Sequence, residues 1–212
     1  MSEQATAPLS GRRAQAARND ERILDSARAV FLADPDAPIS AVAKHAGVGI
    51  GALYRRHASK DELLQRLAAD GMQRYLDEVR AALTDDGDPW IAFTRFVRRC
   101  LDVGAGALTQ RLAGSFTATE ELNRQGREIH EATQQLLART KDAGALRADF
   151  EVGDLSLLLE ALQSIRIGDQ VRASQLRHRY LTVVLDGLHH SSAEQLPGTP
   201  PSWQETSARY NR

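Results

Sequence analysis

Residues 38–57 constrain the fold more than any other stretch, because their pattern predicts two short helices joined by a tight turn. The positions expected to face inward lie three or four residues apart within each helix: Ile39, Val42 and Ala46, then Leu53 and His57. Gly47 would end the first helix, where the chain needs a left-handed backbone that glycine adopts without strain. This is the pattern of a helix-turn-helix, whose second helix enters the major groove of DNA.

The outward face of the second helix combines small, aromatic and basic residues. Its members are Ile50, Gly51, Ala52, Tyr54, Arg55 and Arg56. Arginine can hold guanine or phosphate through two hydrogen bonds, tyrosine can bond phosphate, and glycine lets a DNA backbone approach closely. The alternative is an ordinary solvated helix face, on which paired charges are also common.

A capping box follows at Ser59 and Glu62 and predicts the start of another helix. Ala-Gly-Val-x-x-Gly-x-Leu-Tyr over residues 46–54, followed by Ser59-Lys60-x-Glu62-Leu63, resembles the DNA-binding domain of the TetR family of transcriptional regulators over residues 19–66. Gly49-Ile50-Gly51 and the Pro-rich tail are similar to an actinobacterial subgroup. The resemblance implies an all-α fold, with an N-terminal three-helix helix-turn-helix domain and a C-terminal helical domain for ligand binding and dimerisation.

The resemblance also implies which residues contact DNA: Ser40, Gly49, Ile50, Gly51, Ala52, Tyr54, Arg55, Arg56 and Lys60. Tyr54 and Lys60 match the family and would hold phosphates. Pro38 replaces the usual Thr or Ser cap, so that Ser40 is expected to substitute for the missing hydroxyl. His57 replaces the usual Phe and makes this part of the core more polar.

The charge is distributed as a DNA-binding head would require. Residues 1–66 carry ten Lys and Arg against eight Asp and Glu, whereas the remainder carries 17 against 20, within a net charge of −1. Cys100 is the only cysteine, which excludes an intrachain disulfide; we expect it to pack in the core, with redox sensing as the alternative. The sequence has no signal segment and no apolar run near the roughly 18 residues of a membrane span, so we expect a soluble, cytoplasmic protein without a membrane partner.

Four segments follow from the pattern along the chain: a disordered basic arm (1–18), the helix-turn-helix domain (19–66), an effector-binding and dimerisation domain (67–190) and a flexible tail (191–212). Asn19 would cap the first helix. Asp88 and Thr117 would cap later ones, and Gly144 would close the second of these. The helices expected after the motif run over 59–83, from 89 to about 104, from 117 to about 143, 151–168 and 171–190, with a short one near 108–112.

Sequence signatures of enzymes are missing, since the chain has no H-E-x-x-H, C-x-x-C or G-x-S-x-G. The glycines at 47, 49 and 51 follow a helix instead of a strand, which argues against a dinucleotide loop. His189 and His190 are adjacent, so on a helix they diverge by about 100° and are poorly placed to share a metal. We therefore predict no catalytic residue, no metal and no cofactor.

The second domain of the family surrounds a ligand cavity, and the resemblance implies one here between the helices that start near residues 88, 120 and 151. Apolar walls would come from Phe93, Phe96 and Phe116, and polar contacts from His130, Gln134 and Gln163. The effector would then be small and mostly apolar, of unknown identity. The alternative is that the aromatic residues form ordinary core and that His130 is a satisfied core histidine.

Two apolar stripes mark the last two long helices. By resemblance these helices pair with their copies across a two-fold axis, through Leu158, Leu162, Ile165, Tyr180, Val183 and Val184. The alternative is intrachain core, and both can hold for different residues of each stripe.

The sequence therefore predicts a homodimeric repressor that binds double-stranded operator DNA and leaves it when an effector binds. Two other classes stay open. One is a helical module that binds a small molecule or a protein without operator-specific repression, and the other is an enzyme built on a helical bundle.

Overall fold

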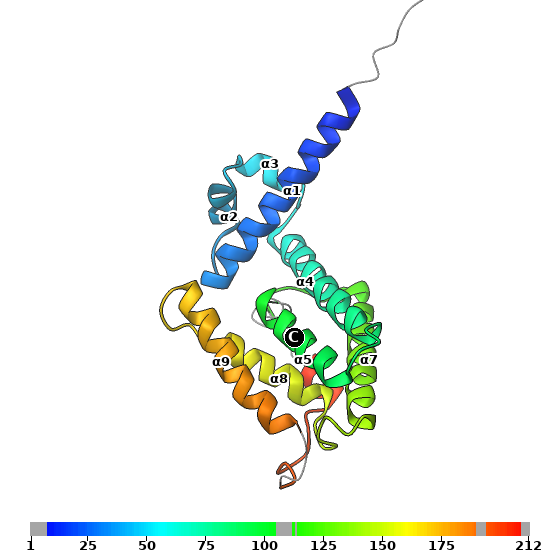
Figure 1. Cartoon of the computed structure of the whole chain (residues 1–212). Helices are drawn as coiled ribbons and strands as arrows, with labels where there is room; N and C mark the ends of the chain where they lie inside the picture. Colours follow the sequence, from blue (N-terminus) through cyan, green and yellow to red (C-terminus); the bar gives the residue numbers. More distant parts are fainter. Residues whose placement is uncertain (1–7, 105–111, 113, 190–193, 209–212) are drawn as a thin grey trace, which may run out of the picture. The chain divides into compact units, whose positions relative to one another are not determined.

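The computed structural model describes residues 8–104, 112, 114–189 and 194–208, with side chains from Asn19 onward (Figure 1). These residues confirm the predicted all-α fold: they form helices, and the single β-type pairing among them is an isolated bridge between Leu146 and His189. The chain divides into two compact units, residues 1–67 and 68–212, called here the N-terminal and C-terminal units. Within the described residues no helix is long and apolar enough to cross a membrane.

The N-terminal unit contains α1 (Pro8–Ala33), α2 (Ile39–Ala46), α3 (Ile50–Tyr54) and the start of α4 (Lys60–Leu83). Its core is mostly apolar, with Ser26 and His57 as the buried polar residues among those described. Buried side chains from each helix meet there: Ile23, Ala27, Phe31, Val42, Leu53, Leu63 and Leu64. Burying a Val, Leu, Ile or Phe side chain stabilises a fold by about 1.5–3 kcal/mol, so these few residues fix the placement of α2 and α3 on α1.

The turn of the motif has the predicted geometry. Gly47 adopts φ 65°, and its backbone N–H donates to the carbonyl of Lys44, which ends α2 as expected of a left-handed glycine. At the other end of α2, Pro38 provides no side-chain cap. The side chain of Ser40 is exposed in the first turn.

The first helix begins earlier than the sequence predicted. α1 starts at Pro8, so Asn19 lies inside the helix and the predicted disorder of residues 8–18 is wrong. Residues 14–17 read Ala-Gln-Ala-Ala, and alanine and glutamine are good helix formers. Proline is tolerated at the first helical position because its missing N–H would have no partner there. Residues 1–7 of the predicted arm lie outside the described residues.

The C-terminal unit contains the rest of α4, α5 (Pro89–Asp102), α7 (Glu120–Asp142), α8 (Val152–Gln163), α9 (Gln170–Leu188) and α10 (Trp203–Ala208). α5 contacts α7, α8 and α9, and the core lies around it (Figure 1). As predicted, Asp88 caps α5, because its carboxylate accepts a hydrogen bond of 3.0 Å from the N–H of Ile91. Cys100 is fully buried in this core, and burial raises the pKa of its thiol.

Three helix ends in this unit differ from the prediction. Thr119 caps α7 in place of Thr117, since its hydroxyl accepts from the N–H of Leu122 at 3.2 Å. α8 stops at Gln163 instead of Gly168, and the carbonyl of Ile165, just beyond it, accepts from the Arg177 guanidinium at 2.9 Å. The predicted tail includes α10, a helix whose start at Ser202 and Glu205 is a capping box. The short helix expected near 108–112 lies, apart from Leu112, outside the described residues.

Candidate nucleic-acid interface and effector domain

One side of α3 is exposed and the opposite side is held in the core by a buried leucine. Leu53 is fully buried, whereas Ile50 and Tyr54 keep 43% and 46% of their surfaces exposed. Gly51 lies between them, and a Cβ built there would meet only the Arg55 guanidinium, at 3.7 Å. Arg55 is exposed as well. We call Ile50, Gly51, Tyr54 and Arg55 the recognition face; its glycine leaves room for a close approach by another backbone.

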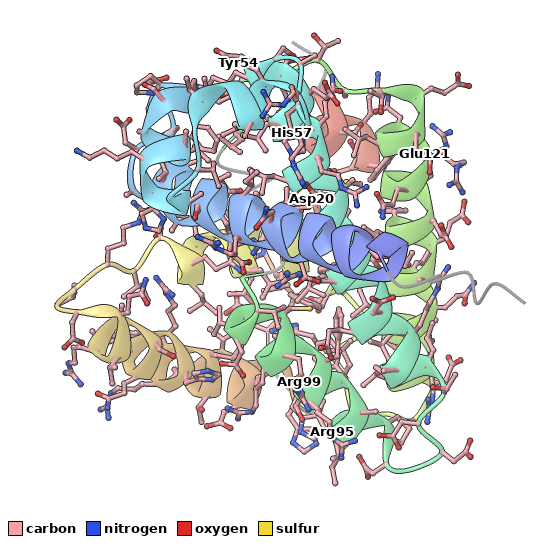
Figure 2. The ribbon with its side chains drawn as sticks, turned by 90° about the horizontal axis from the view of Figure 1, so that it is seen from above. Asp20, Tyr54, His57, Arg95, Arg99 and Glu121 are labelled. Carbon is pink, nitrogen blue, oxygen red and sulfur yellow. The ribbon has the colours of Figure 1, made fainter. Side chains whose placement is uncertain are left out.

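Arg56 is not equivalent to its neighbour Arg55. Its guanidinium forms an ion pair with Asp20 of α1, and its side chain is more buried than that of Arg55. In the view of Figure 2, His57 lies between Tyr54 and Asp20. Arg56 therefore connects the turn after α3 to α1, while the side chain of Arg55 is exposed.

Lys60 is tied to the loop before α2. Its ammonium donates to the carbonyls of Ala37 at 2.9 Å and Pro35 at 3.4 Å, and lies 5.2 Å from the centre of the Phe31 ring. These contacts satisfy two carbonyls of the turn that leads into α2. The resemblance implies that Lys60 also contacts a phosphate. Its ammonium would then have to bind the phosphate and these two carbonyls.

Arg22 is a positioning residue that the sequence did not reveal. Its guanidinium donates to the carbonyl of Ala46 at 2.8 Å, at the C-terminal end of α2. Carbonyls at a helix end have no partner within the helix, and a cation there also complements the helix dipole. A basic residue in a neighbouring helix gives no local signal of this role.

His57 is buried beneath α3, as the sequence predicted. Its Nε2 has no hydrogen-bond partner among the described atoms. Burial lowers the pKa of the imidazole, against a smaller opposing effect of the Glu62 and Asp20 carboxylates. Burial therefore favours the neutral form of the ring. A phenylalanine at this position would bury no unsatisfied polar atom.

The aromatic residues predicted to line an effector cavity are all buried in the C-terminal unit. Phe93 lies 5.6 Å from Trp90 between ring centres, and Phe96 meets Tyr75 edge to face at 5.3 Å. Phe116 is buried next to the segment that lies outside the described residues. Phe93 and Phe96 are thus part of the apolar interior of the unit, which agrees with either a core or a cavity wall.

The three polar residues proposed for the effector site have different surroundings. Gln134 is exposed, so the prediction that it points inward is wrong: it lies on the solvent side of α7, whose inward positions are Thr133, Leu136 and Leu137. His130 packs against Trp203, with 4.9 Å between ring centres. Gln163 is the informative one, because both polar atoms of its amide are buried without a partner among the described residues.

Comparisons with known proteins match both units. The family model for bacterial regulatory proteins of the tetR family matches residues 23–67, and the model for the C-terminal domain of SbtR-like transcriptional regulators matches residues 88–190. A TetR transcription regulatory protein from Mycobacterium vanbaalenii is 30% identical, with 86% of this chain and 99% of that chain covered at a TM-score of 0.58. The chain belongs to the TetR family. It is a DNA-binding transcriptional regulator.

Other TetR-family structures are similar. A TetR transcriptional regulator from Streptomyces coelicolor is 26% identical, with 81% of this chain and 99% of that chain covered at a TM-score of 0.57. LfrR from Mycobacterium smegmatis, in complex with proflavine, is 24% identical, with 85% and 99% covered at a TM-score of 0.60, which shows the fold alone. No curated protein matches the chain.

The residues predicted for the dimer interface of this TetR-family chain fall into two groups. Tyr180 and Val183 of α9 keep 51% and 65% of their surfaces exposed. Leu162 is buried in the core of its own unit, so its prediction as an interface residue is wrong: it faces inward from the last turn of α8. The other predicted members are half-buried against the same core: Leu158, Ile165 and Val184.

The exposed apolar surface extends beyond the predicted set. Leu157 on α8, Ile167 in the following turn and Val171 at the start of α9 are also exposed. Leu157 precedes Leu158 and Leu159 in the sequence, and an uninterrupted run of leucines does not reveal which of them faces outward. Among the described residues, no group of three or more histidine, cysteine or acidic side chains is placed to hold a metal ion.

Proposed function

We propose that this TetR-family regulator is a repressor that binds double-stranded operator DNA as a homodimer and leaves it when a small, mostly apolar effector binds. The observation that carries the DNA part of the proposal is the recognition face of α3, in which Ile50, Tyr54 and Arg55 surround an open glycine. The repressor acts without a catalytic step and works in the cytoplasm, where operator DNA is found.

Each part of the recognition face has a role in this proposal. α3 enters the major groove, and Arg55 reads a base edge through its guanidinium. Tyr54 holds a phosphate, and Gly49 and Gly51 let the sugar-phosphate backbone come close. Ile50 and Ala52 supply apolar surface that can meet a thymine methyl group.

The effector part rests on the buried Gln163 amide and on the buried phenylalanines of the same unit. A buried amide without a partner costs about 1–3 kcal/mol, and a ligand with one acceptor and one donor would satisfy it. Phe93, Phe96 and Phe116 are buried in the same unit and suit an apolar ligand. LfrR, which has a similar fold, was solved in complex with the small molecule proflavine.

Control of DNA binding would pass through α4, which starts in the N-terminal unit and continues into the C-terminal unit. An effector that binds one position of α4 better than another shifts the population toward that position. Only the position in which the two recognition faces match the operator spacing binds DNA tightly. The coupling in such systems is typically about 5–150-fold in affinity.

A gel-shift assay against the DNA upstream of the protein's own gene tests the proposal. The wild-type protein should bind specifically and with strong salt dependence. Arg55→Ala should weaken binding at least about tenfold or relax specificity at one base pair, since a good bidentate contact contributes about 1–3 kcal/mol. Arg127→Ala removes the same charge from an exposed position on α7 and should leave operator affinity unchanged. Equal, sequence-blind binding by all three proteins would favour the helical binding module without operator recognition.

A further inference from the structure

Residues 194–208 cross the C-terminal unit as a docked segment, called here the strap. Its first anchor is a group of three side-chain and backbone contacts. The buried Arg147 guanidinium pairs with Asp149 at 2.6 Å and donates to the carbonyl of Glu194 at 2.8 Å. The Asp149 carboxylate in turn accepts from the N–H of Leu196 at 2.8 Å.

The second anchor is a backbone contact with α8. Gly153 is buried in the first turn of this helix, and a Cβ built there would lie 2.1 Å from the carbonyl oxygen of Pro201. Any other residue at this position would have to displace the strap backbone. The presence of glycine, a poor helix former, is explained by this approach.

The third anchor is the Trp203 indole. It packs on the His130 ring of α7, and its outer edge lies 3.3 Å from where a Cβ of Gly126 would be. The methyl end of Met72 on α4 lies 3.5 Å from the same point. Trp203, Gly126 and Met72 thus meet at one place, where the strap covers the line between α4 and α7.

The same segment therefore accounts for two helical glycines, Gly126 in the interior of α7 and Gly153 in the first turn of α8. They lie on different helices and contact the strap at different points. A tail without a fixed position would not require either of them. The sequences of α7 and α8 are therefore adapted to a strap that is docked in this position.

The strap adds to contacts that already hold α7 to the C-terminal part of α4. Gln125 donates to the carbonyl of Ala69 at 3.4 Å, and Arg80 pairs with Glu128. The hydroxyls of Thr133 and Tyr75 lie 3.3 Å apart. Trp203 adds a further contact to this group, next to Met72 of α4. Anything that moves α4 along or away from α7 has to disturb the seat of Trp203.

We propose that the strap is a regulatory clamp: it holds α4 against α7 and so sets the affinity of the recognition faces for operator DNA. The regulatory part rests on the proposed function, whereas the clamping of α4 does not. Because linkage is reciprocal, operator DNA should also change the equilibrium constant for docking of the strap by the same factor.

Two variants release the strap in the full chain. Trp203→Ala removes the ring, and Gly126→Leu fills its seat while favouring the helix. Gln204→Ala, an exposed neighbour of Trp203 on α10, is the matched control. With Trp90→Phe as background, Trp203 is the only tryptophan, and Gly126→Leu should shift its emission to the red and lower its anisotropy. Unchanged emission would overturn the proposed docking.

Operator affinity measures the regulatory effect. Trp203→Ala and Gly126→Leu should each change it about fivefold or more, in the same direction, while Gln204→Ala leaves it unchanged. The double variant should change it no further, because both substitutions break one contact. A strap shown to be released together with wild-type operator affinity would overturn the regulatory part.

Hydrogen exchange separates this proposal from the proposed function. Amides in residues 69–83 of α4 should exchange faster in both strap variants than in wild type and Gln204→Ala, with or without DNA. Equal exchange would overturn the clamp. If the wild-type protein binds no operator but the exchange difference is present, the proposed function fails and the clamping of α4 stands.

Discussion

The buried Nε2 atom of His57 should affect the stability of the N-terminal unit. Its Nε2 has no partner among the described atoms, and most of the buried side chains of the N-terminal unit are apolar. His57→Phe should raise the free energy of unfolding by about 1–3 kcal/mol, because an unsatisfied buried polar group is removed. Urea unfolding at neutral pH measures the change. A loss of stability would show that the imidazole has a partner, such as bound water.

The same residue predicts a dependence on pH. Burial lowers the pKa of folded His57 below the ordinary value of 6.5, so protonation favours the unfolded chain. Its neutral form contributes fully above about pH 6.5, and stability is lost as the pH falls through the lowered pKa. His57→Phe should make the unfolding free energy fall less between about pH 7.5 and pH 5. The exposed His45, changed to Gln, should leave the wild-type dependence intact.

Arg55 and Arg56 are adjacent, but their surroundings predict opposite phenotypes. Arg56→Ala breaks the partly exposed ion pair with Asp20 and should cost up to about 1 kcal/mol of stability, with a smaller effect on operator affinity than Arg55→Ala. Arg55→Ala should leave stability unchanged. Thermal unfolding and gel shifts of both variants decide the matter. The opposite result would be a larger loss of operator affinity for Arg56→Ala than for Arg55→Ala, at unchanged stability. It would mean that Arg56 breaks its ion pair with Asp20 and contacts DNA.

At the scale of elements, Arg139 of α7 fastens the C-terminal end of α4. Its guanidinium donates to the carbonyls of Ala82 and Leu83 at 3.2 Å, and to those of Asp85 and Gly87 beyond the helix. Arg139→Met keeps the aliphatic stem but leaves these carbonyls without a charged donor. The unfolding free energy in urea should fall by about 1–3 kcal/mol.

The exposed Arg127 on the same helix offers the comparison for that experiment. Arg127→Met should change stability by no more than about 0.5 kcal/mol, as expected of a surface substitution. Equal effects of the two substitutions would mean that the carbonyls at the end of α4 are satisfied without Arg139.

The helices that the sequence predicted well are those whose ends have local causes. Gly47 ends α2 and Asp88 starts α5 through contacts within a few residues, which a sequence pattern records. The start of α1 was missed because Asn19 is a good cap that a longer helix can simply absorb. α10 was missed because residues 194–202, which lead into it, are held by distant partners, among them Asp149 and Gly153.

Site residues follow the same division. Leu53 and the recognition face could be predicted because a short helix with one buried side leaves the other side open. The roles of Arg22 and Asp20 could not, since each acts on a residue more than twenty positions away. Helical spacing also did not reveal that Gln134 is exposed, because it adjoins the inward face of α7.

For the whole molecule, the exposed apolar side chains of α9 predict the assembly. Tyr180→Glu and Val183→Glu should each place a charge in the two-fold interface and yield monomers, which bind operator DNA far more weakly because one head makes half the contacts. Light scattering at micromolar concentration measures the mass. The exposed Ile91 on α5, changed to Glu, introduces the same chemistry elsewhere and should leave the dimer intact. A monomeric wild type would contradict the predicted dimer.

The burial of Cys100 makes the natural sequence a ready background for spin labels. Its thiol is the only one in the chain, is fully inaccessible and is held in the protonated form by its surroundings. A nitroxide reagent should therefore leave the wild type unlabelled and react only with a cysteine introduced at the surface, for example at the exposed Lys44 of α2. In a two-fold dimer that single change gives one pair of electron spins. Their dipolar coupling would report how far apart the two DNA-binding heads are before and after a candidate effector is added.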